Sequence, residues 1–446
     1  MRILYVVHGF PPDTWAGTEV YTLALARAMR GRGHAVAIAT RAPPRGATDP
    51  DWSVDTDVFD GLRVHRIRRR VERLPIAETY RPEEAVAAFF QVLDRERPDI
   101  VHFQHVLHLS VDLVPAARTL GIPCVVTLND YWPLCSRVQL LRPDGVRCER
   151  NQEMGCFPCV KDKDPRLVPL VRAAAPLVHP VAAVLDAALR RRKRSRLARF
   201  ARSWIDLAER NPYVLGRLAQ ADLLLAPSRF LRERFLETGY FDPGKLVHSD
   251  YGTPSHGPGE DLRSKSPTEV LRFGFVGSLV EHKGIATLVE AVGRLDRGRC
   301  ELRVSGAFRP ETDPFHARLA EVAREAPVRF LGPFEHDRIA EVHREIDVLV
   351  VPSTWFENSP LSIHEAFLHG TPVVTSGIGG MAELVRDGVD GFHARPGDAA
   401  HLAIVLRRFL DDAGLAKRLA ADLPRVKTLE EDAAETEARY RELARR

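Results

Sequence analysis

Short, nearly continuous apolar segments alternate along the chain with longer segments in which apolar residues recur every three or four positions. The short segments are rich in Val, Ile and Leu, which is typical of parallel strands buried on both faces. The longer ones, such as 21–33 and 284–295, are typical of amphipathic helices packed on a sheet. The alternation predicts an α/β fold with parallel sheets covered on both faces. The expected strands are 2–8, 35–40, 62–67, 99–104, 123–128 and 222–228, then 271–278, 300–306, 328–332, 347–353 and 372–376.

This strand and helix pattern occurs twice, and the segment 254–268, rich in Pro, Gly and Ser, separates the two series. We therefore expect two doubly wound, Rossmann-like domains facing across a cleft, residues 1–265 and 266–425. Residues 426–446 are strongly charged and predict a closing helix that packs back on the first domain. Residues 135–215 interrupt the first series with four cysteines and a basic helical stretch, and are interpreted as an insertion.

A length of 446 residues is too great for one core and suits two or three domains. A net charge of +4 predicts little about partners, and six cysteines are too few for a disulfide scaffold. The N-terminal MRILYVVHGF has one basic residue and ends at Pro11-Pro12, so it predicts a first strand and not a signal peptide. No apolar stretch is expected to reach the ~20 residues that cross a bilayer. These features favour a cytoplasmic protein.

Two glutamates, Glu357 and Glu365, lie on either side of a predicted helix start. Pro is favoured at the first helical position and a preceding Ser or Asn caps the helix, so the segment Asn358-Ser359-Pro360 predicts a helix from Pro360 to Gly370. The two carboxylates are then about 9 Å apart along the axis, which suits the two ends of an elongated ligand better than an acid/base pair. The helix amides between them suit a diphosphate. The pattern favours a nucleotide-sugar site; the alternative is two surface glutamates beside an ordinary capped helix.

The same stretch follows an apolar strand, and open parallel sheets bind ligands at the carboxyl ends of their strands. Residues 352–391, PSTWFENSPLSIHEAFLHGTPVVTSGIGGMAELVRDGVDG, resemble the donor-site signature of retaining GT-B glycosyltransferases of family four, the group 1 glycosyl transferases. The likeness is most specific over 271–397. It implies the GT-B fold and transfer of a hexose from a UDP- or GDP-linked donor, with retention, to a sugar or lipid-linked acceptor in polysaccharide or glycoconjugate synthesis.

The resemblance also implies roles for single residues. Glu365 would hold the nucleotide ribose, Glu357 would face the donor sugar, and Lys283, in FVGSLVEHKG, would pair with the diphosphate. Ser278 stands where the family usually has an arginine, and Gly17 lies in a stretch that resembles the glycine loop closing on the donor. The donor-binding positions implied are Gly17, Gly277, Ser278, Lys283, Gly306, Glu357, Asn358, Ser359, Pro360, Leu361 and Glu365.

For the transfer step, Lys283 and the helix amides would stabilise the leaving diphosphate, and Glu357 is the second catalytic candidate in this domain. The family often has a histidine just before an aspartate in the first domain, but this chain has Asn129 there, which cannot act as a base. Asp130 and His105 remain candidates on the acceptor side. The Asp-x-Asp spacing at 55–57 lies in a polar stretch interpreted as a solvated loop, so no catalytic metal is expected.

Four cysteines, Cys135, Cys148, Cys156 and Cys159, lie within 25 residues of the insertion, the last two as Cys-x-x-Cys. Four thiols in one loop suit a tetrahedral structural zinc. The alternatives are an iron–sulfur cluster and four unrelated reduced thiols.

The basic stretch that follows, within 189–207, could place Leu189, Leu197, Phe200, Trp204 and Leu207 on one helical face. It predicts a peripheral contact with anionic lipid at the inner membrane face; a solvated helix packed on the first domain is the alternative. Nothing in its context favours nucleic acid.

Three other functions stay open. A nucleotide-sugar epimerase of the same fold would consume donor without an acceptor, and an inactive binding protein would retain only the donor site. A nicotinamide oxidoreductase is disfavoured, because GIGGMA (377–382) follows a late strand of its domain and not the first, and no acidic residue stands convincingly about 20 positions on.

Overall fold

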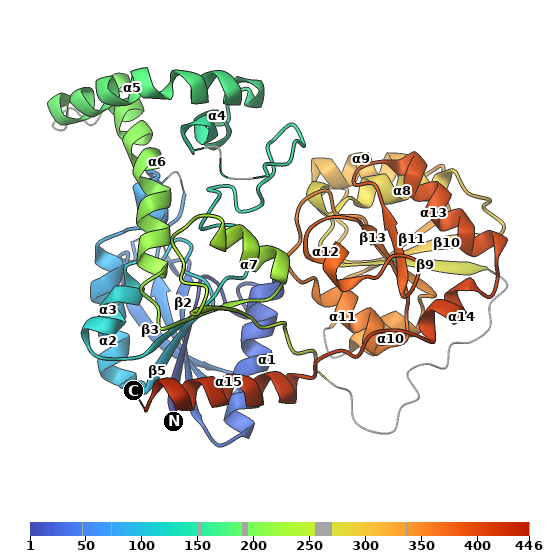
Figure 1. The fold of residues 1–446 in the computed structure, drawn as a ribbon, viewed down its shortest axis with the longest axis horizontal. Helices are drawn as coiled ribbons and strands as arrows, with labels where there is room; N and C mark the ends of the chain where they lie inside the picture. Colours follow the sequence, from blue (N-terminus) through green and yellow to red (C-terminus); the bar gives the residue numbers. More distant parts are fainter. Residues whose placement is uncertain are drawn as a thin grey trace. The chain divides into compact units, whose positions relative to one another are not determined.

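The computed structural model describes residues 1–46, 48–72, 74–149, 151, 153–189, 195–254, 270–335 and 338–445. The chain forms two compact units (Figure 1). Unit 1 is Met1–Pro227, Leu231–Ser249 and Glu430–Arg446, and unit 2 is Ser228–Phe230 and Asp250–Leu429. The predicted linker, 254–268, falls almost wholly on 255–269, which lies outside the described residues. Each unit contains one largely parallel sheet with helices, so the predicted α/β class is confirmed.

Unit 1 is built on an eight-stranded sheet in the order β3-β4-β2-β1-β5-β6-β7-β8. The strands are β1 (Arg2–Val7), β2 (Ala35–Ala42), β3 (Val54–Phe59), β4 (Leu62–Arg68), β5 (Ile100–Phe103), β6 (Cys124–Thr127), β7 (Leu223–Ala226) and β8 (Leu246–His248). The helices α1 (Gly17–Gly31), α2 (Glu84–Glu96), α3 (Leu113–Thr119) and, from Leu231 onward, α7 (Arg229–Leu236) belong to its α/β framework. Residues 3–7 of β1 are almost completely buried, as a central strand covered on both faces requires.

One predicted loop is a strand. Residues 54–59 form β3, the only antiparallel strand among the described residues of this sheet, paired with β4 at its edge. Asp55 accepts a hydrogen bond from Arg68 at 2.9 Å and Asp57 accepts one from Arg66 at 2.6 Å. The polar composition of this segment reflects an exposed edge, and its two carboxylates are bound to arginines of the neighbouring strand.

Unit 2 has a six-stranded, all-parallel sheet in the order β11-β10-β9-β12-β13-β14. The strands are β9 (Leu271–Val276), β10 (Cys300–Ser305), β11 (Val328–Gly332), β12 (Val348–Val351), β13 (Val373–Ser376) and β14 (Gly391–Ala394). The helices are α8 (Ile285–Gly293), α9 (Pro314–Ala323), α10 (Ile339–Arg344), α11 (Leu361–Leu368), α12 (Gly379–Leu384), α13 (Ala399–Asp411) and α14 (Leu415–Ala420). One apolar cluster joins the sheet to α8 and α13 and another joins it to α11 and α12, so both faces are covered.

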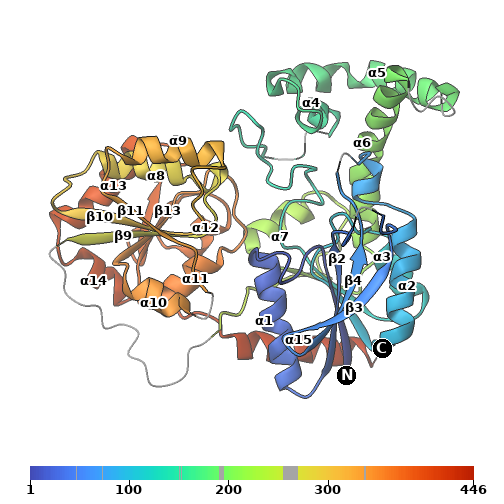
Figure 2. The same cartoon turned by 180° about the vertical axis from the view of Figure 1, so that it is seen from behind.

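The segment interpreted as an insertion, 135–215, lies between β6 and β7. The chain between these strands contains the cysteine loop, α4 (Phe157–Val160), α5 (Val168–Leu189) and α6 (Arg196–Leu218). Figures 1 and 2 show α5 lying crosswise over the outer end of α6. The fully buried guanidinium of Arg210 on α6 donates to the carbonyl oxygens of Trp132 and Pro133 at 2.5 and 3.3 Å. These bonds fix α6 to the start of the insertion.

Two expectations about this region need correction. The expectation that no apolar stretch could cross a bilayer is wrong, because residues Pro165–Leu189 are long and apolar enough to do so. Only 11% of the most apolar window of this helix is buried. The predicted lipid-facing side of 189–207 is divided, since Trp204 and Leu207 are buried in unit 1 and the ring of Phe157 lies against those of Phe200 and Trp204. Residues 190–194 lie outside the described residues.

The last helix, α15 (Leu429–Leu443), packs in unit 1 although it follows unit 2 in sequence. The Tyr21 hydroxyl of α1 donates to Asp432 at 2.7 Å, and Arg32, directly after α1, donates to Glu437 at 2.6 Å. Both chain ends therefore lie in unit 1 (Figure 2).

Candidate functional site

Both sheets reverse their winding direction at a central pair of strands. In unit 2 the chain runs from β9 outward to β11, then returns to β12 and continues outward to β14; in unit 1 the reversal lies between β1 and β5. The loops that follow two such strands diverge and leave a crevice at the carboxyl edge of the sheet, where open sheets bind ligands. Lys283 and Glu357 follow β9 and β12, while His8 and His105 follow β1 and β5. Each unit thus carries polar side chains at its switch point.

Glu357 is the centre of the loop after β12. Its Oε1 accepts hydrogen bonds from Lys283 Nζ at 2.7 Å, Ser353 Oγ at 2.7 Å and Trp355 Nε1 at 2.8 Å. The side chain of Lys283 is 30% exposed and that of Glu357 is 7% exposed. Burial alone would raise the pKa of Glu357, but the Lys283 ammonium and the other donors outweigh burial and lower it. The carboxylate is therefore ionised at neutral pH beside a cation that reaches the surface.

The sequence assigned these two residues to different parts of a ligand, and the structure pairs them with each other. Lys283 ends the 3-10 turn η4 (Glu281–Lys283), followed by Gly284 at φ 71°. A Cβ at 284 would lie 2.0 Å from the Pro352 carbonyl oxygen, so only glycine lets the turn after β9 approach the loop after β12. Ser353 and Trp355, which orient the carboxylate, were missed, although both stand within four residues of Glu357.

The backbone of that loop is held by α12. Gly380 N donates to the Glu357 carbonyl oxygen at 2.8 Å, and a Cβ at 380 would lie 1.3 Å from the Asn358 carbonyl oxygen. The glycines of the GIGGMA stretch therefore serve as a packing surface for residues 357–358.

Helix α11 starts one residue later than predicted. Pro360 is its N-cap, with extended backbone at φ −63° and ψ 117°, and Gly370, at φ 70°, follows its end. The expected side-chain cap is wrong: Ser359 Oγ donates to Asp250 at 2.7 Å and lies 2.7 Å from His364 Nε2. The loop is fixed to unit 2 by these bonds, and the first amides of α11 carry no side-chain cap.

Glu365 lies on the second turn of α11 and is only 6% exposed, whereas the ribose role implied a carboxylate accessible to ligand. Burial raises its pKa to about 7. The neutral acid is therefore the main form at mildly acidic pH.

This pKa predicts a pH-dependent stability. The ordinary pKa of a glutamate is 4.5, so as the pH rises Glu365 ionises in the unfolded chain before it ionises in the folded one. The free energy of unfolding should therefore fall by about 3 kcal/mol as the pH rises from about 4.5 to about 7. Glu365→Gln should match the wild type near pH 4.5 and be more stable by about that amount above pH 7. Urea unfolding at several pH values measures this, with exposed Glu290→Gln as control; parallel pH profiles for Glu365→Gln and wild type would contradict it.

Gly277 and Gly306 lie in the turns after β9 and β10. Gly277 has φ 141°, and a Cβ at 306 would lie 2.1 Å from the Gly277 carbonyl oxygen. Gly306 therefore permits the two turns to touch. Ser278, between these turns and η4, is exposed.

The switch point of unit 1 holds a second polar cluster. His105 Nε2 lies 3.1 Å from Asp130 Oδ2, and its Nδ1 accepts a hydrogen bond from the Leu107 amide, so Nε2 carries the proton and donates to Asp130. The His8 and His105 rings are 4.3 Å apart, and His8 lies 3.7 Å from the buried Glu19. Burial and the neighbouring His105 lower the pKa of His8.

The structure thus brings together the two acceptor-side candidates and adds two residues that sequence reasoning missed. His8 directly follows the first strand, which is the signal that could have identified it. His102, on β5 itself, is wholly buried and bonded to Thr127 and Tyr440. Gly17 begins α1, and a Cβ there would meet nothing within 4 Å.

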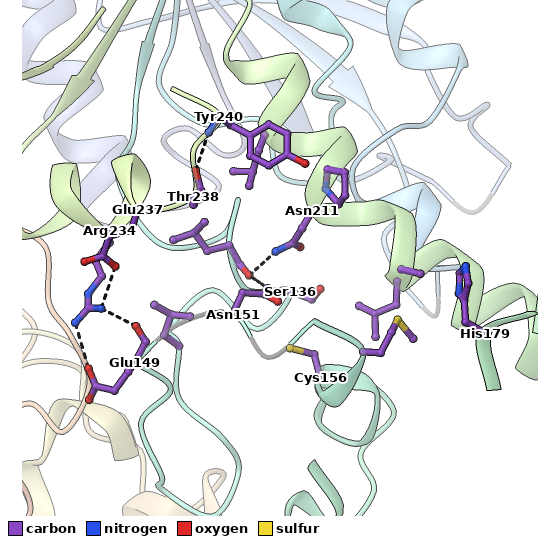
Figure 3. A pocket seen from close by; sticks show the side chains of 17 residues that line it. Ser136, Glu149, Asn151, Cys156, His179, Asn211, Arg234, Glu237, Thr238 and Tyr240 are labelled. Atoms are coloured by element: carbon purple, nitrogen blue, oxygen red, sulfur yellow. Dashed lines mark hydrogen bonds and ion pairs between the residues drawn. The ribbon is translucent and has the colours of Figure 1, made fainter. Parts of the chain in front are cut away.

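A separate cavity of about 840 Å³ lies in unit 1 beneath the insertion. Figure 3 shows Glu149, Asn151 and Cys156 of the cysteine loop around it, with His179 on α5. Arg234 donates to the carbonyl and the carboxylate of Glu149 at 2.8 and 3.1 Å. These bonds tie the cysteine loop to α7, and the cavity belongs to a different unit from the Lys283–Glu357 pair.

All four cysteines of the loop line one small cavity, which Val168 of α5 also borders. Burial and the neighbouring thiols Cys135 and Cys159 raise the pKa of Cys148 to about 11, so a metal would have to displace protons. Among the described residues, no three His, Cys, Asp or Glu side chains are arranged to hold a metal ion. The structural zinc stays a prediction.

We expect purified protein to contain one zinc per chain by elemental analysis, since the four cysteines line one small cavity and four thiolates would satisfy the tetrahedral preference of zinc. Cys156→Ser with Cys159→Ser should lose the metal and lower the melting temperature by several degrees. Cys300→Ser, buried in unit 2, is the control that should keep it. Iron in place of zinc, or a metal-free wild type, would contradict the prediction.

Two α/β units, each with a largely parallel sheet, are the arrangement expected of the GT-B architecture. The model of the family Glycosyl transferases group 1 matches residues 260–423, and that of the Glycosyl transferase 4-like domain matches residues 16–151. The chain therefore belongs to the GT-B glycosyltransferases of family four.

Similar curated proteins carry several glycosyltransferase names. The D-inositol 3-phosphate glycosyltransferase of Stackebrandtia nassauensis is 31% identical over 222 residues, which are 46% of this chain and 49% of that protein. The 2-deoxystreptamine glucosyltransferase of Streptomyces kanamyceticus is 35% identical over 141 residues, 31% of this chain and 36% of that protein. These matches span a third to a half of the relatives' own lengths.

Solved structures agree in fold over almost the whole chain. The sucrose-phosphate synthase of Thermosynechococcus elongatus has a TM-score of 0.64 at 19% identity, covering 99% of this chain and 98% of that one. The Anabaena protein HepE, in complex with UDP and glucose, has a TM-score of 0.61 at 17% identity, covering 98% and 99%. The predicted GT-B fold is confirmed.

Proposed function

We propose that this protein transfers a hexose from a nucleotide-diphosphate sugar to an acceptor hydroxyl, with retention, in polysaccharide or glycoconjugate synthesis. The observation that carries the proposal is the Lys283–Glu357 pair, a cation and an ionised carboxylate fixed 2.7 Å apart at the switch point of unit 2. The UDP and glucose named for the Anabaena protein support a nucleotide-sugar donor.

Lys283 is suited to hold the diphosphate. An ammonium has three N–H donors. Among the described residues, one of them donates to Glu357, so the other two can donate to phosphate oxygens. The uncapped amides at the start of α11 add a partial positive charge. Charge that develops on the departing diphosphate would be stabilised by groups already in place, which is where such electrostatic effects accelerate a reaction most.

The carboxylates would hold the two ends of the donor. The three donors on Glu357 all meet Oε1, so Oε2 is the oxygen that a hydroxyl of the sugar would approach. Glu365 is buried in the free protein, so the ribose role requires donor binding to expose its carboxylate to the ribose hydroxyls; a carboxylate that accepts hydrogen bonds has a lower pKa. Donor binding should therefore release a proton near neutral pH. The backbone of residues 358–361, with the turns at Gly277, Ser278 and Gly306, would complete the donor contacts of unit 2.

On the acceptor side, His105 and Asp130 form one hydrogen-bonded pair at the switch point of unit 1. We place the acceptor hydroxyl there, with the pair positioning it. The stereochemical outcome is tested by the NMR coupling constant of the newly formed anomeric proton.

The alternatives differ in what they consume. An epimerase would convert nucleotide sugar with no acceptor present, whereas a transferase needs both. A nicotinamide oxidoreductase is disfavoured further by Gly379 and Gly380, because their backbone packs on residues 357–358, where a dinucleotide fingerprint would leave room for pyrophosphate.

A thermal-shift panel of nucleoside diphosphates, nucleotide sugars and nicotinamide dinucleotides tests the proposal. We expect a UDP or GDP compound to raise the melting temperature, and Glu365→Ala to abolish that shift, while exposed Glu290→Ala keeps it. Nucleotide release that requires an acceptor sugar completes the test. A shift with a nicotinamide dinucleotide alone, or donor turnover independent of acceptor, would sink the assignment.

A further inference from the structure

Helix α5 turns apolar side chains outward. Leu170, Leu177, Val181 and Val184 are 66%, 78%, 59% and 69% exposed. Their spacings of seven, four and three residues place them on one face of the helix. Surface helices of soluble domains bury such a stripe, and exposed apolar patches of this kind mark interaction sites.

The opposite face of α5 is already occupied. Val168, Ala182 and Asp186 are buried, and α5 lies over the end of α6 (Figures 1 and 2). His179 stands two residues from both Leu177 and Val181, on the other side of the helix, and lines the cavity of Figure 3. The outward stripe is therefore not a wall of that cavity.

The length and composition of α5 would allow a bilayer crossing, but the topology of unit 1 does not. The chain enters the insertion from β6 and leaves it into β7, and these two strands pair in register within one sheet. A single crossing would put paired strands on opposite sides of a membrane. The helix can instead lie along a surface, as interfacial helices do.

Charge around the helix identifies the surface. Residues 161–202 contain twelve Lys or Arg, three Asp and no Glu, an excess larger than the +4 of the whole chain. Among the described residues, Lys163, Arg166 and Arg172 near the start of α5, and Arg196 and Arg199 on α6, are exposed. Basic side chains beside an apolar stripe are the pattern that anionic bilayers attract.

We propose that the outward stripe of α5 seats this protein on the surface of an anionic lipid bilayer, as a monotopic contact. The stripe enters the boundary between headgroups and acyl chains, and the flanking arginines meet the headgroups. This contact goes beyond the proposed function and moves the membrane site from the predicted 189–207 to the preceding helix.

Co-sedimentation of the full chain with vesicles tests the proposal. The wild type should bind vesicles of phosphatidylcholine mixed with phosphatidylglycerol. It should bind more weakly to vesicles of pure phosphatidylcholine, and more weakly to either kind of vesicle at high salt. Leu177→Glu with Val181→Glu should weaken binding roughly a hundredfold, about tenfold for each apolar side chain withdrawn. Ile404→Glu, at a site 65% exposed on α13, should bind as the wild type does. Arg196→Glu with Arg199→Glu should reduce binding to the mixed vesicles.

Circular dichroism melting checks that the variants fold, and the milder Leu177→Ser with Val181→Ser replaces the double glutamate if it does not. Failure of the wild type to bind mixed vesicles, or equal binding by wild type and stripe variant, overturns the proposal. So does a stripe-dependent dimer in sedimentation velocity without vesicle binding, which would assign the face to a second copy of the chain.

Discussion

Lys283→Ala should lower the rate of sugar transfer by about a hundredfold to a thousandfold, the range seen when one preorganised electrostatic group is removed. The Lys283 ammonium donates a hydrogen bond to Glu357 Oε1, and in the proposed function it also binds the departing diphosphate. Its loss should therefore destabilise the leaving group in the transition state. Among the described residues, the buried carboxylate would keep Ser353 and Trp355 as donors, and loss of the ammonium raises its pKa. Steady-state kinetics with saturating donor measures the effect.

Paired variants separate chemistry from folding. Glu357→Gln alone should also be severely impaired, and the double variant should be little worse than either single one, because the two groups act as a unit. Lys417→Ala, an exposed lysine on α14, should leave the rate unchanged. A Lys283→Ala enzyme with normal kcat would remove the central support for the proposed function.

Gly380→Ala is the second substitution with a large expected effect. The new Cβ would lie 1.3 Å from the Asn358 carbonyl oxygen and 2.5 Å from its carbon, and these are backbone atoms that cannot rotate away. Residues 357–358 must shift, which breaks the 2.8 Å bond from Gly380 N to the Glu357 carbonyl. We expect a loss of about 2–4 kcal/mol in the free energy of unfolding, and donor affinity lowered at least about tenfold, measured by urea titration and calorimetry.

Gly293→Ala is the matched control, because this glycine ends α8 and its Cβ would make only an ordinary 3.4 Å contact. It should be neutral or slightly stabilising. If Gly380→Ala retained full stability and affinity, the α12 glycines would have no part in shaping the loop.

Much of the framework could be predicted because apolar runs bounded by turn residues report strands directly. The start of α11 was placed within one residue from the segment Asn358-Ser359-Pro360, since the fixed φ and missing amide hydrogen of Pro favour a helix start, although the expected side-chain cap did not form. The sequence also located Lys283 and Glu357 correctly in loops after strands. It could not show that they bind each other, since 74 residues separate them and contact depends on β9 and β12 being neighbours.

Other features could not be predicted because the exposure of a residue depends on the fold and not on its own segment of sequence. Residues 54–59 are polar because β3 is an edge strand, so their composition imitates a loop. Trp204 and Leu207 form an apolar face that suits lipid equally well, but the protein buries them itself. In α5 the apolar composition was visible, and only the packing of α6 beneath it decides which face remains open.

The return of α15 to unit 1 has a consequence for how the protein matures. Tyr440 is fully buried, its hydroxyl bonded to His102 of β5 and Tyr5 of β1, the two strands at which the sheet reverses. The ribosome must therefore release the whole of unit 2 before the half of the protein made first can acquire its final helix. Truncating the chain before Leu429 would therefore destabilise unit 1, which is synthesised first, and not unit 2, which directly precedes the truncation.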